Sequence, residues 1–121
     1  MFKDRPLPGH ALARPAHEAA RCAGAMGQYW PYHDRLFDAQ PEFEHEDLLR
    51  YAAELGLDRA RFARCLDEGT YAPAVEADLA QARALGVTST PTFLIGGQVL
   101  VGNHPIETFR RVIDDALRAL R

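Results

Sequence analysis

One stretch decides the fold of this 121-residue chain: Gly86-Val87-Thr88-Ser89-Thr90-Pro91-Thr92-Phe93-Leu94-Ile95-Gly96-Gly97. A proline has no amide hydrogen, so it belongs at the first residue of a strand or on a sheet edge. Pro91 therefore predicts a short apolar strand that starts at Thr92. The Gly-Gly pair predicts a two-residue turn that folds this strand into a hairpin with Gln98-Val99-Leu100-Val101.

Helical spacing of apolar residues dominates the chain on both sides of this hairpin. Before it, Leu7-Pro8-Gly9 interrupts any regular structure, and glycines separate the apolar periods that follow. Asp58 is the predicted N-cap of one of these helices. The predicted helices lie near residues 14–23, 30–38, 48–55, 59–68 and 71–85, and a final amphipathic helix covers 106–120.

Composition and charge exclude several classes of function. The net charge of −3 and the pI near 5.9 give no basis for binding nucleic acid or an anionic membrane surface. No apolar run approaches the ~20 residues of a spanning helix. The first residues lack the apolar core of a signal peptide, which makes the chain as given cytoplasmic, but the sequence does not assign the compartment of the protein.

Several blocks in the right order resemble the bacterial DsbA family of thiol–disulfide oxidoreductases. The pattern G-V-x-x-T-P-T-F-x-I-x-G is similar to that family's cis-proline loop and the strand after it, so the resemblance predicts a cis Thr90–Pro91 bond although local propensity favours trans. The segment from Phe2 to His10 looks like the end of the second thioredoxin strand. The family's inserted helical domain is matched by residues 19–23 with 28–37, 55–58 and 62–66.

The resemblance implies an α/β fold, a thioredoxin-like domain of the DsbA type with an inserted helical domain. The expected organisation is a single truncated domain over 1–121, with the helical insertion at 11–86 and the β-hairpin plus last helix at 87–121. The first strand and first helix, which carry the family's Cys-x-x-Cys motif, have no counterpart here. The resemblance therefore predicts a chain without its own redox centre.

What the family implies about function follows from the parts that are present. Thr90 and Pro91 are the expected substrate-binding residues. The expected substrates are protein or peptide thiols, and no cofactor is expected. No residue of this chain is expected to be catalytic. The alternative is a redox-inert binding or interaction module with the same fold. The related kappa-class glutathione transferases also share the fold without Cys-x-x-Cys, but their glutathione site draws on the absent amino-terminal unit.

The remaining candidate residues have mainly structural interpretations. Relatives with a second, structural disulfide make Cys22 and Cys65 a candidate pair, and two buried free thiols are the alternative. None of the five histidines forms a His-x-x-x-His pair, so no metal site is expected. Trp30 and Phe37 share a helical face with His33, and core packing is the expectation for both.

The missing strand also predicts an assembly. In the thioredoxin arrangement, the strand that starts at Thr92 pairs on its other side with the first strand. Without that neighbour, its N–H and C=O groups form an open edge that is a template for pairing with another chain. A homodimer is therefore expected, with a fold-back of Met1–Arg5 onto the edge as the alternative.

Overall fold

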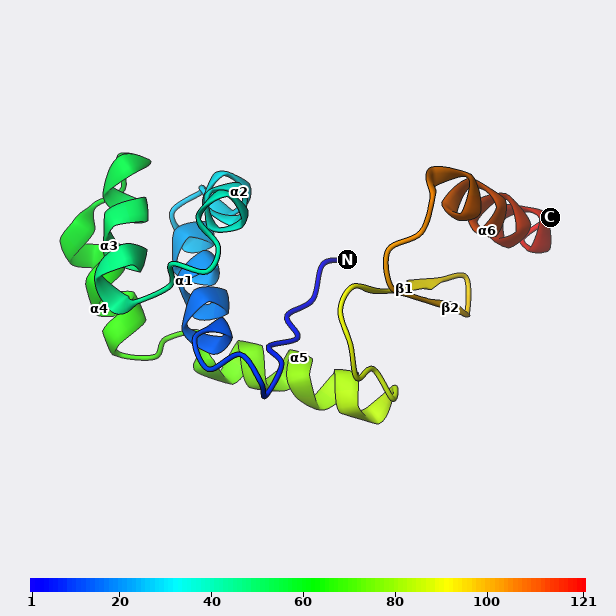
Figure 1. The fold of residues 1–121 in the computed structure, drawn as a ribbon, viewed down its shortest axis with the longest axis horizontal. Coiled ribbons are helices and arrows are strands. Elements are labelled where there is room, and N and C mark those ends of the chain that lie inside the picture. The colour runs from blue at the N-terminus through cyan, green and yellow to red at the C-terminus, as the bar shows by residue number, and fades with distance from the viewer. The chain divides into compact units, whose positions relative to one another are not determined.

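A computed structural model describes all 121 residues of the chain, which forms two compact units, Met1–Ala82 and Arg83–Arg121 (Figure 1). Every predicted helix is present, and so is the hairpin. No helix has the length and apolar content needed to cross a bilayer. The elements are α1 (Ala13–Ala25), α2 (Tyr29–Ala39), α3 (His45–Glu54), α4 (Arg59–Asp67), α5 (Ala72–Ala84), β1 (Thr92–Ile95), β2 (Gln98–Val101) and α6 (Ile106–Ala119).

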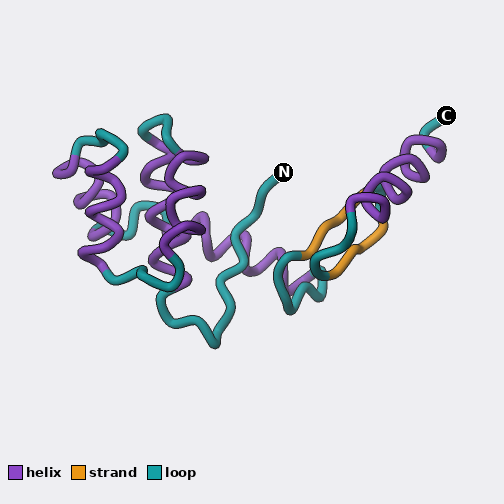
Figure 2. The backbone as a smooth tube through the Cα atoms, turned by 45° about the horizontal axis from the view of Figure 1, so that its top comes forward, coloured by secondary structure: helices purple, strands orange, loops and turns teal.

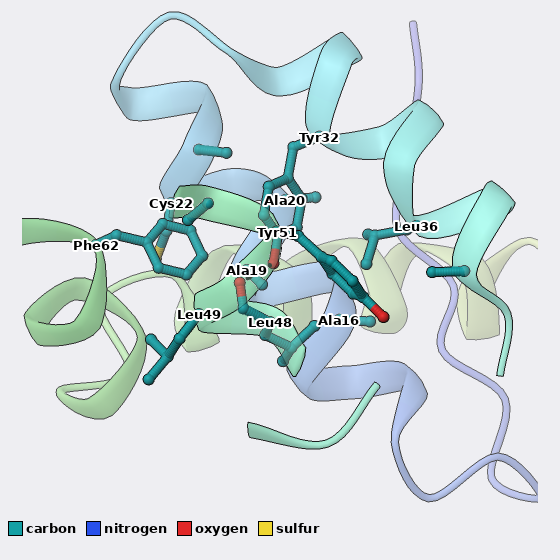
Figure 3. Packing of buried hydrophobic residues seen from close by; sticks show 13 residues of the cluster. Ala16, Ala19, Ala20, Cys22, Tyr32, Leu36, Leu48, Leu49, Tyr51 and Phe62 are labelled. Atoms are coloured by element: carbon teal, nitrogen blue, oxygen red, sulfur yellow. Dashed lines mark hydrogen bonds between the residues drawn. The ribbon is translucent and has the colours of Figure 1, made fainter. Parts of the chain in front are cut away.

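The core of the first unit is built around α1, which contacts α2, α3 and α4. One face of α1 carries small side chains, among them Ala19 and Ala23, which are completely buried. Small side chains let neighbouring helices approach closely, so large groups from those helices fill the space above them (Figure 3). The largest fully buried side chains include Tyr32, Tyr51 and Phe62.

The buried tyrosines satisfy their hydroxyl groups on backbone carbonyls. Tyr32 donates to the Leu48 carbonyl at 2.9 Å, and Tyr51 donates to the Glu42 carbonyl at 2.6 Å. A buried hydroxyl without a partner would cost free energy, so these bonds allow two tyrosines inside an otherwise apolar core. They also tie α2 to α3 and α3 to the loop that precedes it.

Local sequence signals set the helix starts. Asp58 is the N-cap of α4, as predicted, and its carboxylate accepts the Arg61 N–H at 3.1 Å. At the start of α3, Glu44 and Asp47 form a capping box in which each side chain accepts the other's backbone N–H. Glu44 before α3 and Asp47 in its first turn therefore stabilise the start of this helix.

Two expectations from sequence are wrong in this unit. Phe2 to His10 forms no strand, because no neighbouring strand pairs with this segment and the sheet contains only β1 and β2. Trp30 and Phe37 are 54% and 63% exposed instead of lying in the core. They share the face of α2 that also carries His33, whereas the core takes the face that carries Tyr32.

The amino-terminal segment is held by a buried ion-pair network instead of by strand pairing. Asp4 is only 2% exposed; its carboxylate bonds His17 and Arg21, and its N–H donates to Asp78 on α5 at 2.9 Å. Arg21 also donates to Asp78 at 2.8 Å. Burial by itself would raise the pKa of Asp4, but the bonds from His17 and Arg21 outweigh it, so this pKa lies below its usual value.

A disulfide joins Cys22 of α1 to Cys65 of α4 across a Cα–Cα distance of 6.0 Å. The bond resolves the open alternative for these cysteines, because the chain contains no free thiol. Cys22 is buried in the core and Cys65 is partly buried against it, so the bridge fixes one side of α4 to the core of the unit.

Asp4→Asn is expected to lower the free energy of unfolding by about 2 kcal/mol near neutral pH, because charged hydrogen bonds inside the protein are lost. A carboxyl group with a lowered folded-state pKa stabilises above its unfolded pKa of about 3.9 and loses that contribution as pH falls through the folded value. The difference between wild type and variant should therefore shrink below pH ~4. Urea unfolding across pH measures it.

The matched control for this network is Asp34→Asn. Asp34 also bonds a histidine, His33, but its side chain is 76% exposed. A change within about 0.5 kcal/mol is expected there. Equal destabilisation by the two variants would contradict the assigned role of Asp4.

Removing the disulfide with the double variant Cys22→Ala and Cys65→Ala should lower the free energy of unfolding by about 3–4 kcal/mol. The closed loop spans 43 sequence positions, and opening it returns conformational entropy to the unfolded chain. Guanidinium unfolding of the variant and of the oxidised wild type gives the difference. Indistinguishable midpoints and slopes would show that the bridge does not constrain the unfolded state.

Candidate functional site

The predicted substrate-binding residues lie in the second unit, on the loop between α5 and β1. Gly86 ends the helical segment with a positive φ of 73°, and Pro91 directly precedes β1. The Thr90–Pro91 bond is cis. Thr90 and Pro91 are both exposed.

Hydrogen bonds close this loop on either side of Thr90 without engaging its own backbone. The Thr92 hydroxyl donates to the Ser89 carbonyl at 2.7 Å, and the Gly102 N–H donates to the Pro91 carbonyl at 2.8 Å. No bond within the chain uses the N–H or C=O of Thr90. An exposed, ordered segment with free backbone groups can bind an extended polypeptide through main-chain hydrogen bonds.

The hairpin after the loop has one covered and one open face. Its strands pair antiparallel with Thr92 opposite Val101 and Ile95 opposite Gln98. Phe93 packs on Phe109 of α6 with ring centroids 4.8 Å apart, and α6 lies beside the hairpin in Figure 2. The opposite face carries aliphatic side chains that are more than half exposed: Leu94, Val99 and Val101.

Gly96 is required where the hairpin turn meets α6. Its φ is +54°, and a Cβ atom placed there would lie 2.6 Å from the Cβ of Ala116. Any larger residue would therefore push the hairpin turn away from α6.

The first unit contains a cavity of about 370 Å³, which is a second place to look for a site. Burial raises the pKa of Tyr29 in its wall to about 12, so the hydroxyl stays neutral at physiological pH. Asp4 and Arg21 are bonded to each other, which leaves no free charged group or nucleophile facing the cavity. The lining residues are Phe2, Asp4, Arg21, Gly24, Ala25, Tyr29 and Tyr71.

The other candidate groups are not brought together into a reactive site. The histidines make separate contacts, such as His45 with Asp67 at 2.7 Å and His104 with the Val101 carbonyl at 2.7 Å. No group of three or more His, Cys, Asp or Glu residues has the arrangement of a metal site. Sequence reasoning missed the Asp4–Arg21–Asp78 network; its signal was a pair of charges, Arg21 and Asp78, inside otherwise apolar helical faces.

Comparison with known proteins identifies the fold. A search of solved structures finds the thiol-disulfide exchange protein alpha-DsbA2 from Wolbachia pipientis, with a TM-score of 0.78 and 25% sequence identity over 95% of this chain and 63% of that protein. The DsbA-like α/β architecture expected from sequence is therefore confirmed. A helix-rich chain with a small two-stranded sheet is what this part of the fold looks like.

Curated relatives are much longer than this chain. The Na(+)/H(+) antiporter NhaA of Herminiimonas arsenicoxydans is 40% identical over 117 residues, which are 97% of this chain and 19% of that protein. The protein named Na(+)/H(+) antiporter NhaA 3 of Salinispora tropica is 36% identical over 93% of this chain and 17% of its own length. The chain thus spans less than a fifth of these two relatives.

A sequence family described as Thioredoxin matches residues 1–115, nearly the whole chain. The family match covers both units, and the structural match to a DsbA protein covers the same elements. The chain belongs to the thioredoxin family, within its DsbA-like group.

Proposed function

We propose that this chain is the substrate-docking part of a DsbA-like thiol–disulfide oxidoreductase, and that its partners are protein or peptide thiols. One observation carries the proposal: Thr90 has a free, exposed N–H and C=O on the loop that precedes β1. An extended substrate segment would bond this backbone and continue along β1. The substrate's own backbone groups would supply the complementary donors and acceptors.

The chemistry of exchange needs groups that these 121 residues do not offer. A thiolate must attack a disulfide and a second thiol must resolve the mixed disulfide, but Cys22 and Cys65 are bonded to each other. This bond favours the second candidate function for the chain taken alone, a redox-inert binding module. In both cases the docking loop is the working part.

The same docking role is proposed for the part of the antiporter-named relatives that resembles this chain. The part of those proteins that resembles this chain is less than a fifth of their length, and the same residues match the thioredoxin family. We therefore assign to this part the binding of thiol-containing polypeptides and leave transport to the remainder of those proteins. We also propose that residues 1–121 form a single truncated domain and that the chain forms a homodimer.

The purified 121-residue chain is expected to show no turnover in an insulin-reduction assay with dithiothreitol, because no vicinal dithiol is present. The control is the double variant Cys22→Ala and Cys65→Ala, which should match the same background rate. Turnover that disappears in the double variant would mean that this disulfide is itself the exchanging pair, and the docking proposal for a redox-inert chain would be wrong.

Docking is testable with the peptide acetyl-Thr-Val-Cys-Val-Thr-amide, its thiol methylated to prevent exchange with the disulfide. Binding should shift the amide NMR signals of Thr90 and Thr92. Thr90→Pro removes one backbone N–H donor. It should raise the Kd of the peptide about tenfold, which corresponds to the net free energy of one hydrogen bond. Thr90→Val keeps the N–H and should bind like wild type. Equal weakening by both variants would point to side-chain recognition instead.

A further inference from the structure

Helix α4 is attached to the first unit by fewer buried groups than its neighbour α3. In α4 only the side chain of Phe62 is fully buried, and those of Cys65 and Leu66 are partly buried. In α3 four side chains are buried, and the Tyr51 hydroxyl bonds a backbone carbonyl. A helix with few buried apolar contacts opens locally at a lower free-energy cost than the rest of its unit.

The outer face of α4 is suited to water by its own sequence. It carries three arginines, Arg59, Arg61 and Arg64, whose side chains are exposed. Charged side chains of this kind are rarely buried, so this face of the helix is a solvent face. The small number of buried contacts is therefore a property of α4 itself.

The ion pairs of α4 with α3 add little to its attachment. His45 Nε2 lies 2.7 Å from Asp67 Oδ1, and the Arg59 guanidinium lies 3.8 Å from the Glu46 carboxylate. All four side chains are more than half exposed, and exposed pairs contribute little to stability. Apart from its one buried ring, α4 thus depends on the disulfide.

A cavity of about 310 Å³ borders the last turn of α4. Leu66 and Asp67 of α4 belong to its wall, together with residues of α1 and of the start of α3. Side chains that face an unfilled space lack contacts on that side, so the packing that holds this turn is weaker than in a filled core. The lining residues are Leu12, Pro15, Glu18, Phe43, Glu44, His45, Leu48, Leu66 and Asp67.

We propose that the Cys22–Cys65 bond is a redox-sensitive latch on α4: when a dithiol reduces it, α4 opens locally while α1, α2 and α3 keep their packing. The bond joins the helix with the fewest buried contacts to the helix at the centre of the core. The latch belongs to the first unit and is independent of the proposed docking loop, which belongs to the second.

Burial decides which sulfur atom a dithiol attacks first. Cys22 is 1% exposed and Cys65 is less buried, so the thiolate of the dithiol attacks Cys65 Sγ and forms a mixed disulfide. Cys22 leaves as a thiolate and takes up a proton from water. The second thiol of the dithiol then attacks the dithiol sulfur of the mixed disulfide and releases Cys65. Two electrons pass to the protein, and the dithiol becomes a cyclic disulfide.

The first attack requires α4 to open. In the closed state the leaving Cys22 thiolate would lie in the apolar core, where an unpaired charge is costly. The rate of reduction therefore follows the population of chains in which α4 is open. A slow, stoichiometric reduction of this kind differs from the turnover of an oxidoreductase.

Amide hydrogen exchange of the full chain tests the local opening. On reduction with dithiothreitol, the amides of residues 62–66 should exchange at least about tenfold faster, and those of Tyr32 and Tyr51 should change less than about threefold. The double variant Cys22→Ala and Cys65→Ala is the control, because its α4 amides should exchange fast with or without dithiothreitol. Equal acceleration in α2, α3 and α4, or unchanged exchange in α4, would overturn the latch.

Two helix-cap variants separate local opening from global unfolding. Asp58→Ala removes the N-cap bond of α4 and should speed the reduction by dithiothreitol about fivefold. Glu44→Ala removes the capping box of α3, and its rate should stay within about twofold of wild type. Mass spectrometry after quenching with iodoacetamide measures both rates. Equal acceleration by the two variants would place the attack in the unfolded chain, and no acceleration by Asp58→Ala would place it in the closed state. Either result would overturn the proposal.

Discussion

The close packing of helices on the alanine face of α1 is the constraint on which the first unit depends. Because Ala19 and Ala23 are fully buried, α2, α3 and α4 can approach the same helix and bury Tyr32, Tyr51 and Phe62 above it. The Cys22–Cys65 bridge crosses this contact from α1 to α4. A larger side chain on the α1 face would separate the helices and open cavities around three aromatic rings.

The second unit is not held together by a buried core like that of the first, since few of its side chains are buried. Val112 is its one side chain below a tenth exposure, and the hairpin is held mainly by its ladder, by Phe93 on Phe109 and by the close approach of Gly96 to Ala116. An open aliphatic face is the consequence. The same lack of cover leaves Thr90 exposed, as the proposed docking function requires.

The two units differ in which groups they bury and which they leave accessible. The first holds its cysteines in a bond, with Cys22 inside the core, while the second offers free backbone groups next to a proline. Most of the buried side chains lie in the first unit, whereas the proposed binding residues lie in the second, where little is buried. The proposed docking function needs no titratable group, because main-chain hydrogen bonds would hold the substrate segment.

Much of the fold follows from the sequence by itself. Glycines and apolar periods predict the helices, Gly96-Gly97 predicts the hairpin, Asp58 predicts a helix start, and the Thr90–Pro91 block places the chain near DsbA proteins. These signals are local, because each depends on residues that are close together in the sequence. The family match over residues 1–115 agrees with them.

What only the tertiary structure decided concerns contacts between distant residues. Helical spacing puts Trp30 and Phe37 on one face of α2 but cannot say which face the core covers, and the core takes the face with Tyr32. Spacing equally leaves open whether Cys22 meets Cys65. Asp4 bonds to Asp78 and Arg21 because α1 and α5 bring these groups beside the amino-terminal segment. Periodicity records which side chains share a surface, whereas the packing of whole elements determines what lies against it.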